Sequence, residues 1–272
     1  MGFFGFLDFT KEGPGVSKNG PKKKAFFVFF ETFFRNFWRF FSINLFYVLL
    51  CVPIITHGMS RAGITHITRN IARDKHSFGL SDFLETIKKN WKQSLWVGII
   101  NTLLTAVICF GISFYNASYI DTQNNFSLAG LVVCLMLLAF FGMMNFYIYT
   151  LMITFDFKTK ALYVNSFKFV LLNFWRNLLC GVLLLLVYGL YALVFFTFPN
   201  IRVLIIELII MAATLPAFKF LLIQFFTFGS IKKYIIDPYY KAHPNADIEK
   251  RRNLGLEIPE EADDYEEPLS WE

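Results

Sequence analysis

The sequence predicts an all-α fold, a polytopic bundle of transmembrane helices accompanied by interfacial amphipathic helices. Hydrophobic residues make up 56% of the 272 residues and charged residues only 17%, whereas a soluble domain is about a quarter charged. Mean hydropathy is +0.48, and the apolar residues come in blocks too long for a soluble core. Because lipid offers the backbone no hydrogen-bonding partner, each long block is expected to be helical.

Five apolar blocks are expected to be full spans, since a helix needs about 20 residues to cross a bilayer. The first block is the shortest and contains Pro53. The predicted spans are residues 40–57, 95–115, 127–155, 178–198 and 203–228.

Lysine and arginine counts predict the orientation, because cationic short loops stay in the cytoplasm. Residues 60–94 carry seven such residues, residues 116–126 carry none and residues 156–177 carry four. Further cations follow the last span. The alternation places the C-terminus in the cytoplasm.

The basic N-terminal segment, residues 1–24, conflicts with a single crossing after it, which would place these cations outside. The N-terminus is therefore predicted to be cytoplasmic, with residues 59–73 forming a short return or re-entrant helix; a single crossing is the alternative. Residues 25–39 and residues 80–94 have apolar residues at helical spacing opposite charged ones. Both are expected to be amphipathic helices in the interface plane.

Three pairs of a tryptophan and a cation are typical of interfacial anchors. Tryptophan lies at headgroup level and the adjacent cation meets anionic lipid at the cytoplasmic face. The pairs are Trp38 with Arg39, Trp91 with Lys92, and Trp175 with Arg176.

The membrane domain is expected to cover residues 25–235, and a cytoplasmic tail residues 236–272. From residue 256 the tail holds eight acids and no base, a composition typical of disorder. Folding back onto the basic cytoplasmic face is the alternative.

No motif indicates catalysis, a cofactor, a metal site or nucleic-acid binding. The chain lacks a phosphate-binding glycine loop, an HExxH pair and a GxSxG elbow. Its four cysteines lie inside apolar blocks without CxxC spacing and are interpreted as small hydrophobic residues.

Ionisable residues inside the apolar blocks are the main candidate functional residues, since each costs about 2.5–3.5 kcal/mol to insert. Glu207 and Lys219 share the last span, roughly 18 Å apart along its axis, with Pro216 between them. A broken helix flanked by charges can line a transport path. Alternatively, Glu207 lies near the outer surface and Lys219 snorkels inward. Arg61 and His66 on the return segment are the other candidates.

Residues 43–58 form an apolar helix that ends in a P-x-x-T-x-G string containing Pro53, Thr56 and Gly58. With the aromatic and basic stretch that follows, this pattern resembles the YesL-like family of bacterial membrane proteins over roughly residues 25–235. The chain departs from that pattern at Met59, where proline is expected. Physically, Pro53 ends or kinks the span, Thr56 bonds freed backbone groups and Gly58 permits a reversal. A structural turn is our interpretation, and a ligand site the alternative.

The resemblance implies a location in the bacterial cytoplasmic (inner) membrane and no established activity. Members are often encoded beside carbohydrate ABC-transporter genes. This favours a non-enzymatic protein that is accessory or regulatory to carbohydrate uptake, with the lipid bilayer and ABC-transporter subunits as partners. The alternative is a transporter or channel using Glu207, Pro216 and Lys219. An intramembrane enzyme would need a clustered nucleophile and base, which the sequence does not display.

Overall fold

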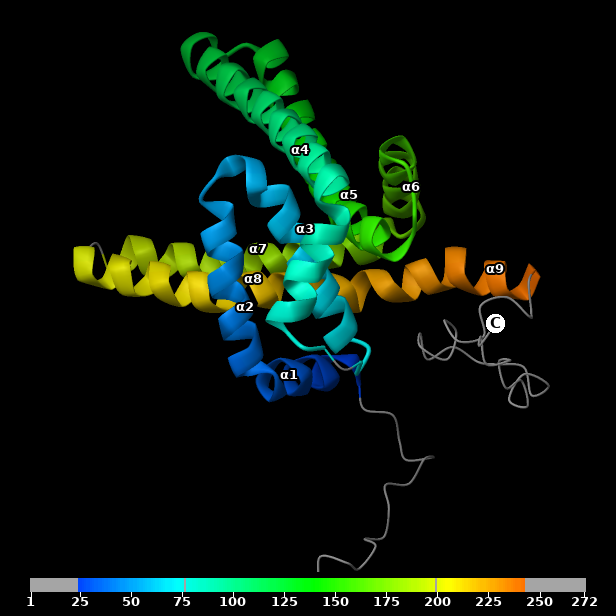
Figure 1. The fold of residues 1–272 in the computed structure, drawn as a ribbon. Helices are drawn as coiled ribbons and strands as arrows, with labels where there is room; N and C mark the ends of the chain where they lie inside the picture. The colour runs from blue at the N-terminus through cyan, green and yellow to red at the C-terminus, as the bar shows by residue number, and fades with distance from the viewer. Residues whose placement is uncertain (1–23, 76, 199, 243–272) are drawn as a thin grey trace, which may run out of the picture.

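The computed structural model describes residues 24–75, 77–198 and 200–242, and every regular element within them is a helix (Figure 1). The predicted N-terminal segment up to residue 23 and the tail from residue 243 lie outside the described residues. In chain order the helices are α1 (Ala25–Arg35), α2 (Phe37–Cys51), η2 (Ile54–Thr56), α3 (His57–Ile71), α4 (Leu80–Thr122), α5 (Asn125–Thr154), α6 (Thr159–Leu172), α7 (Phe174–Thr197), α8 (Ile201–Ile231), η3 (Lys232–Ile236) and α9 (Asp237–Ala242).

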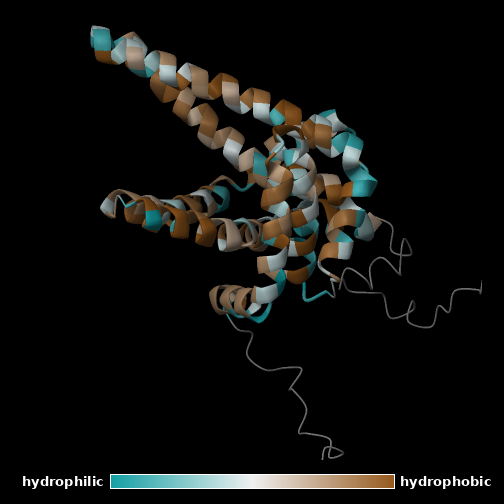
Figure 2. Ribbon diagram, turned by 60° about the vertical axis from the view of Figure 1, so that its left-hand side comes forward, coloured by the Kyte–Doolittle hydropathy of each residue, from teal (hydrophilic) through white to brown (hydrophobic). Residues whose placement is uncertain are grey.

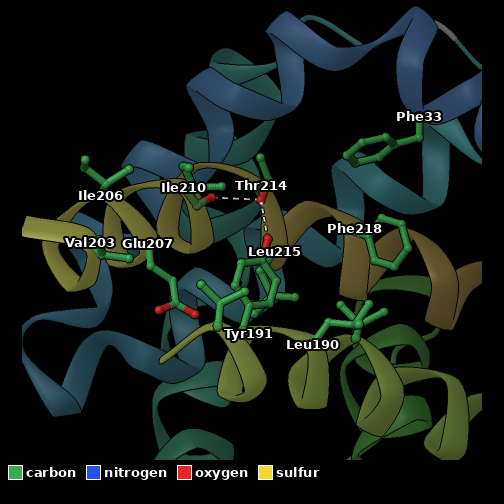
Figure 3. A pocket seen from close by; sticks show the side chains of 12 residues that line it. Phe33, Leu190, Tyr191, Val203, Ile206, Glu207, Ile210, Thr214, Leu215 and Phe218 are labelled. Carbon is green, nitrogen blue, oxygen red and sulfur yellow. Dashed lines mark hydrogen bonds between the residues drawn. The ribbon is translucent and has the colours of Figure 1, made fainter. Parts of the chain in front are cut away.

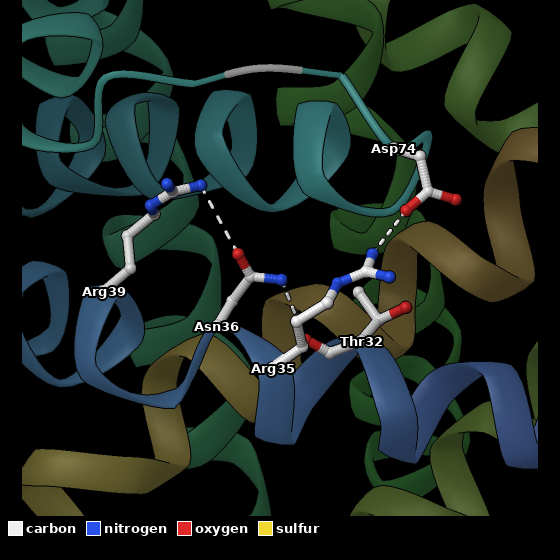
Figure 4. A network of polar contacts seen from close by, with 5 residues as sticks. All are labelled: Thr32, Arg35, Asn36, Arg39 and Asp74. Atoms are coloured by element: carbon white, nitrogen blue, oxygen red, sulfur yellow. Dashed lines mark hydrogen bonds and ion pairs between the residues drawn. The ribbon is translucent and has the colours of Figure 1, made fainter. Parts of the chain in front are cut away.

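The amphipathic helix expected over residues 25–39 bends at Asn36, so that its last residues belong to α2. The Asn36 amide turns back and donates a hydrogen bond to the Thr32 carbonyl oxygen, 2.9 Å away. Beside it, Arg35 forms an ion pair with Asp74, which follows α3 (Figure 4). These contacts fix the angle between α1 and α2 and fasten the bend to the connection after α3.

The reversal after α2 is built from the proline and threonine of the P-x-x-T-x-G string. The Thr56 hydroxyl donates to the carbonyl oxygens of Leu50 and Pro53, and the Thr56 N–H also donates to Pro53. The Leu50 carbonyl oxygen near the end of α2 is therefore satisfied without further helix. With 15 residues, α2 is about 22 Å long, shorter than a hydrocarbon core of about 30 Å, so its length does not support a fifth full span.

Four helices are long and apolar enough to cross a membrane: Leu80–Thr122, Asn125–Thr154, Phe174–Thr197 and Ile201–Ala242. The first of these joins the expected amphipathic helix over residues 80–94 to the span that follows, because no proline interrupts the 43 residues of α4. Helix α6 was not among the expected elements. Its buried residues Leu162, Ser166, Phe169 and Val170 nevertheless recur at helical spacing.

The long helices form two hairpins, α4 with α5 and α7 with α8, that diverge from a common junction (Figure 2). Buried residues lie mainly in the junction halves: 83–101 of α4, 143–152 of α5, 177–184 of α7 and 215–231 of α8. The outer halves are largely apolar and exposed. Lipid or other apolar helices must cover them in a membrane.

Helix α3 occupies the junction and packs against α2, α4, α5 and α8. It is buried although it carries many polar residues. The hydroxyl groups of Ser60, Thr65 and Thr68 donate to carbonyl oxygens one turn earlier in α3, over 2.6–2.9 Å. These polar groups therefore find hydrogen-bond partners within α3 itself, so the apolar helices can enclose them.

Two glycines allow α3 and α4 to approach closely, as small residues do between membrane helices. A Cβ atom on Gly58 would lie 2.1 Å from the Ser94 carbonyl oxygen, and one on Gly98 would lie 2.7 Å from the Gly58 Cα atom. Gly58 thus permits the close crossing of α3 and α4 as well as the reversal that precedes α3.

We predict that Gly58→Ala destabilises the protein by about 1–3 kcal/mol, because the methyl group overpacks the crossing. Gly189→Ala is the matched control, since its Cβ atom would meet nothing within 4 Å. Thermal unfolding of the two variants in detergent measures the difference. Equal unfolding temperatures for both variants and the wild type would refute the close crossing.

Candidate functional site

Arg61 is the centre of a polar network at the junction. Its Nη1 atom donates to the Asn145 side-chain oxygen at 3.3 Å, and Asn101 donates to the same oxygen at 2.9 Å. Tyr163 in turn donates to the Asn101 side-chain oxygen at 2.8 Å. The Arg61 guanidinium lies 5.6 Å from the Tyr149 ring centroid. A buried cation is thus held by neutral oxygens and a ring, with its Nε atom left without a hydrogen-bond partner in the described part of the chain.

A cavity of about 460 Å³ opens between the α2–α3 reversal and α4. The polar members of its lining are His57, Arg61, Asn101, Thr102 and Thr105. Hydrocarbon tails cannot hydrogen-bond to such a surface. These polar groups therefore suit water, a polar solute or a polar group of a partner helix, while the larger part of the lining surface is apolar.

Lys219 of α8 approaches the same region of the junction. Its ammonium lies 6.0 Å from the Tyr188 ring centroid and 5.8 Å from that of Phe220, and it is within electrostatic range of Arg61 and His57. Two of the predicted site residues, Arg61 and Lys219, are thus brought together. They carry like charges, so they repel each other instead of pairing.

His66 belongs to a separate group on the next turns of α3. Its Nδ1 atom lies 3.3 Å from Nη2 of Arg69, and its Nε2 atom lies 3.0 Å from the Asn70 amide nitrogen. Among residues 24–75, 77–198 and 200–242, no three His, Cys, Asp or Glu side chains gather into a set able to hold a metal ion.

Glu207 lies apart from these residues, in a cavity of about 510 Å³ between α7 and α8 (Figure 3). The cavity is mainly apolar, and its polar lining includes Tyr191 and Thr214, whose hydroxyl oxygens are 3.1 Å apart. One carboxyl oxygen of Glu207 is buried without a hydrogen-bond partner among the described residues. Arg61, His66 and Lys219 do not line this cavity, so the four predicted ionisable residues do not converge on one site.

Pro216 has no N–H to donate to the Ala212 carbonyl oxygen, and Asn44 of α2 bridges the next pair of backbone groups in α8. The Asn44 side-chain oxygen accepts from the Ala217 N–H at 2.8 Å, and its amide donates to the Ala213 carbonyl oxygen at 2.6 Å. Asn44 is fully buried. At this break the Asn44 amide inserts between two backbone groups of α8 and takes the place of a helical hydrogen bond. We call this contact between α2 and α8 the Asn44 joint.

The three predicted interfacial tryptophans are all exposed: Trp38 is 77% exposed, Trp91 49% and Trp175 78%. Their neighbouring cations differ in what they contact. Lys92 lies 5.5 Å from the Trp91 ring centroid. Arg39 donates to Asn36, and Arg176 donates to the Phe225 carbonyl oxygen of α8.

The sequence reasoning missed the neutral polar residues of the junction, Asn44, Asn101 and Asn145, as well as two further arginines, Arg69 and Arg73. A signal was present for the asparagines, since an amide inside an apolar block needs a partner as much as a charge does. Arg69 and Arg73 entered the sequence analysis only in the count of cations that predicts the orientation.

Four apolar helices of sufficient length, diverging from a buried junction, define a polytopic helical membrane protein. A sequence model of the family described as "Protein of unknown function, DUF624" matches residues 40–112, which cover most of α2, the reversal, α3 and α4 up to residue 112. No curated protein matches the chain. No solved structure matches it either.

We predict that Asn44→Leu destabilises the protein by about 1–3 kcal/mol, because it leaves the backbone groups beside Pro216 unpaired. The loss of stability should be smaller in a Pro216→Ala background, where the backbone of α8 can restore its own helical hydrogen bonds. A thermal-unfolding cycle of the two single variants and the double variant measures this coupling. Strictly additive effects would contradict the proposed joint.

Proposed function

We propose that the protein is a non-enzymatic accessory or regulatory subunit that binds membrane helices of a carbohydrate importer of the ABC type. The observation that carries the proposal is the cavity of about 460 Å³ beside α4. Its polar lining, with Arg61 and Asn101, lies next to the apolar outer halves of diverging hairpins. A partner helix supplies an apolar face together with polar groups, whereas lipid tails supply apolar contacts alone.

The sequence resemblance supports a sugar importer as the partner, through the genes that accompany the YesL-like family. The same resemblance supports the bacterial cytoplasmic membrane as the location, whereas the orientation is supported by the distribution of lysine and arginine. This distribution also supports cytoplasmic placement of both termini, with α2 and α3 forming the hairpin that returns the chain. The exposed tryptophans Trp38, Trp91 and Trp175 would then lie at the cytoplasmic headgroup level.

A transporter or channel is the second candidate, favoured by the unpartnered carboxyl oxygen of Glu207. As a transporter, the protein would use Glu207 as its coupling group. The transport path would pass the break in α8 at Pro216, and the charge of Lys219 would control entry to it. The separation of Glu207 from the junction favours the accessory function instead, because the cavity of Glu207 does not include Lys219.

We expect membrane subunits of a sugar importer to co-isolate with the full-length chain from native membranes, as identified by mass spectrometry. Thr105→Trp should reduce their recovery by about tenfold or more, equivalent to about 1.4 kcal/mol, because the indole fills the cavity. Thr122→Trp, at the exposed far end of the same helix, should not. Recovery of no importer subunit, or equal recovery with both variants, would rule out the proposed docking.

We further expect that proteoliposomes holding this protein alone show no sugar or proton flux above that of empty vesicles. A flux that Glu207→Gln abolishes and Asp121→Asn preserves would establish the transporter instead. Asp121 is a suitable control because it is an exposed carboxylate at the α4–α5 turn.

A further inference from the structure

A separate cavity, of about 250 Å³, lies where the end of α3 meets α7 and α8. Three arginines line it: Arg69 of α3, Arg73 just after α3, and Arg176 in the first turn of α7. The α8 side contributes Gln224 and Phe228. The cavity is smaller than the roughly 300–1,000 Å³ of typical ligand pockets, so it suits a small chemical group.

Within residues 24–75, 77–198 and 200–242, the three guanidinium groups have only neutral partners. Arg69 donates to the carbonyl oxygen of Ile153 and the hydroxyl of Thr154, over 3.1 and 2.8 Å. Arg73 lies over the ring of Phe228, 3.7 Å from its centroid. No carboxylate of the described residues lines the cavity. The nearest acid in sequence, Asp74, is paired with Arg35 (Figure 4).

Several polar atoms of these residues are buried and unused. Nε and Nη2 of Arg73, Nε of Arg69 and the side-chain oxygen of Gln224 have no hydrogen-bond partner within the described residues. Burial, together with the charge of Arg69, lowers the pKa of Arg73 to about 9. Arg73 therefore remains a cation at neutral pH, and an unpaired buried cation is costly.

We propose that this cavity binds a phosphate group, either the headgroup phosphate of an anionic phospholipid or free inorganic phosphate. Guanidinium groups form bidentate, charge-assisted hydrogen bonds to phosphate oxygens. Such a ligand would neutralise the surplus charge and satisfy the unused Arg73 N–H groups. The Gln224 oxygen would accept a hydrogen bond from a hydroxyl of the ligand, on the phosphate or on a glycerol headgroup.

The position of the cavity favours the lipid source. Trp175, which precedes Arg176, is 78% exposed, as expected of a tryptophan at headgroup level. Arg176 is exposed and reaches across to α8 through the Phe225 carbonyl oxygen, 3.1 Å away. The cavity that Arg69 and Arg73 line therefore has an exposed cation, Arg176, in its wall.

The test uses the purified full-length chain in neutral detergent and has two arms. Native mass spectrometry compares retention of phosphatidylglycerol and phosphatidylcholine, and isothermal titration measures binding of inorganic phosphate. We expect phosphatidylglycerol to be retained preferentially, with Arg73→Gln and Arg176→Gln each weakening retention by about tenfold or more, equivalent to about 1.4 kcal/mol. Arg202→Gln, an exposed arginine at the other end of α8, should leave it unchanged. Binding of inorganic phosphate with the same variant dependence would instead assign the site to free phosphate.

Equal retention of the two lipids together with no phosphate binding would overturn the proposal. Unchanged binding of both probes by Arg73→Gln and Arg176→Gln would overturn it as well. If Arg73→Gln does not fold, Arg176→Gln carries the test, since Arg176 is exposed and lies outside the hydrophobic core.

Discussion

The enclosure of a polar helix by apolar ones is the constraint on which the rest of this structure depends. Helix α3 carries arginines, threonines and two histidines. It could not lie bare against hydrocarbon, where unsatisfied polar groups cost several kcal/mol each. Its packing against α2, α4, α5 and α8 removes that cost. The long hairpins meet at the junction that α3 occupies, where most of their buried residues lie.

Two contacts of the junction depend on particular small or polar residues. Gly58 and Gly98 bring α3 against α4, and Asn44 repairs the break that Pro216 makes in α8. The arginines of α3 then face two different cavities, one beside α4 and one beside α7. Enclosure therefore creates two chemically distinct polar sites: one suited to a partner helix and one suited to an anion.

The fold class and the four long apolar helices follow from hydropathy alone, because bilayer thickness sets a length that the sequence displays directly. The unbroken α4 was missed, although the absence of proline from residues 80–122 is visible in the sequence. The bend at Asn36 did not follow, since it depends in part on Arg35 meeting Asp74 across the fold. The same holds for the candidate site. Arg61 and Lys219 were singled out by their charge, but their separation from Glu207 depends on how the hairpins diverge. Asn44 was overlooked because an amide carries no charge, although its role is as specific as that of any ion pair.

Hydrogen–deuterium exchange of the full-length chain in lipid nanodiscs tests the enclosure of α3 most directly. The account predicts that backbone amides of residues 60–71 stay protected for as long as those of the buried half of α5, residues 143–152. Amides of Asp156 and Lys158, which are exposed in the connection between α5 and α6, should exchange far sooner. Exchange across α3 as fast as in that connection would show that the helix is not enclosed, and the two polar cavities would lose their basis.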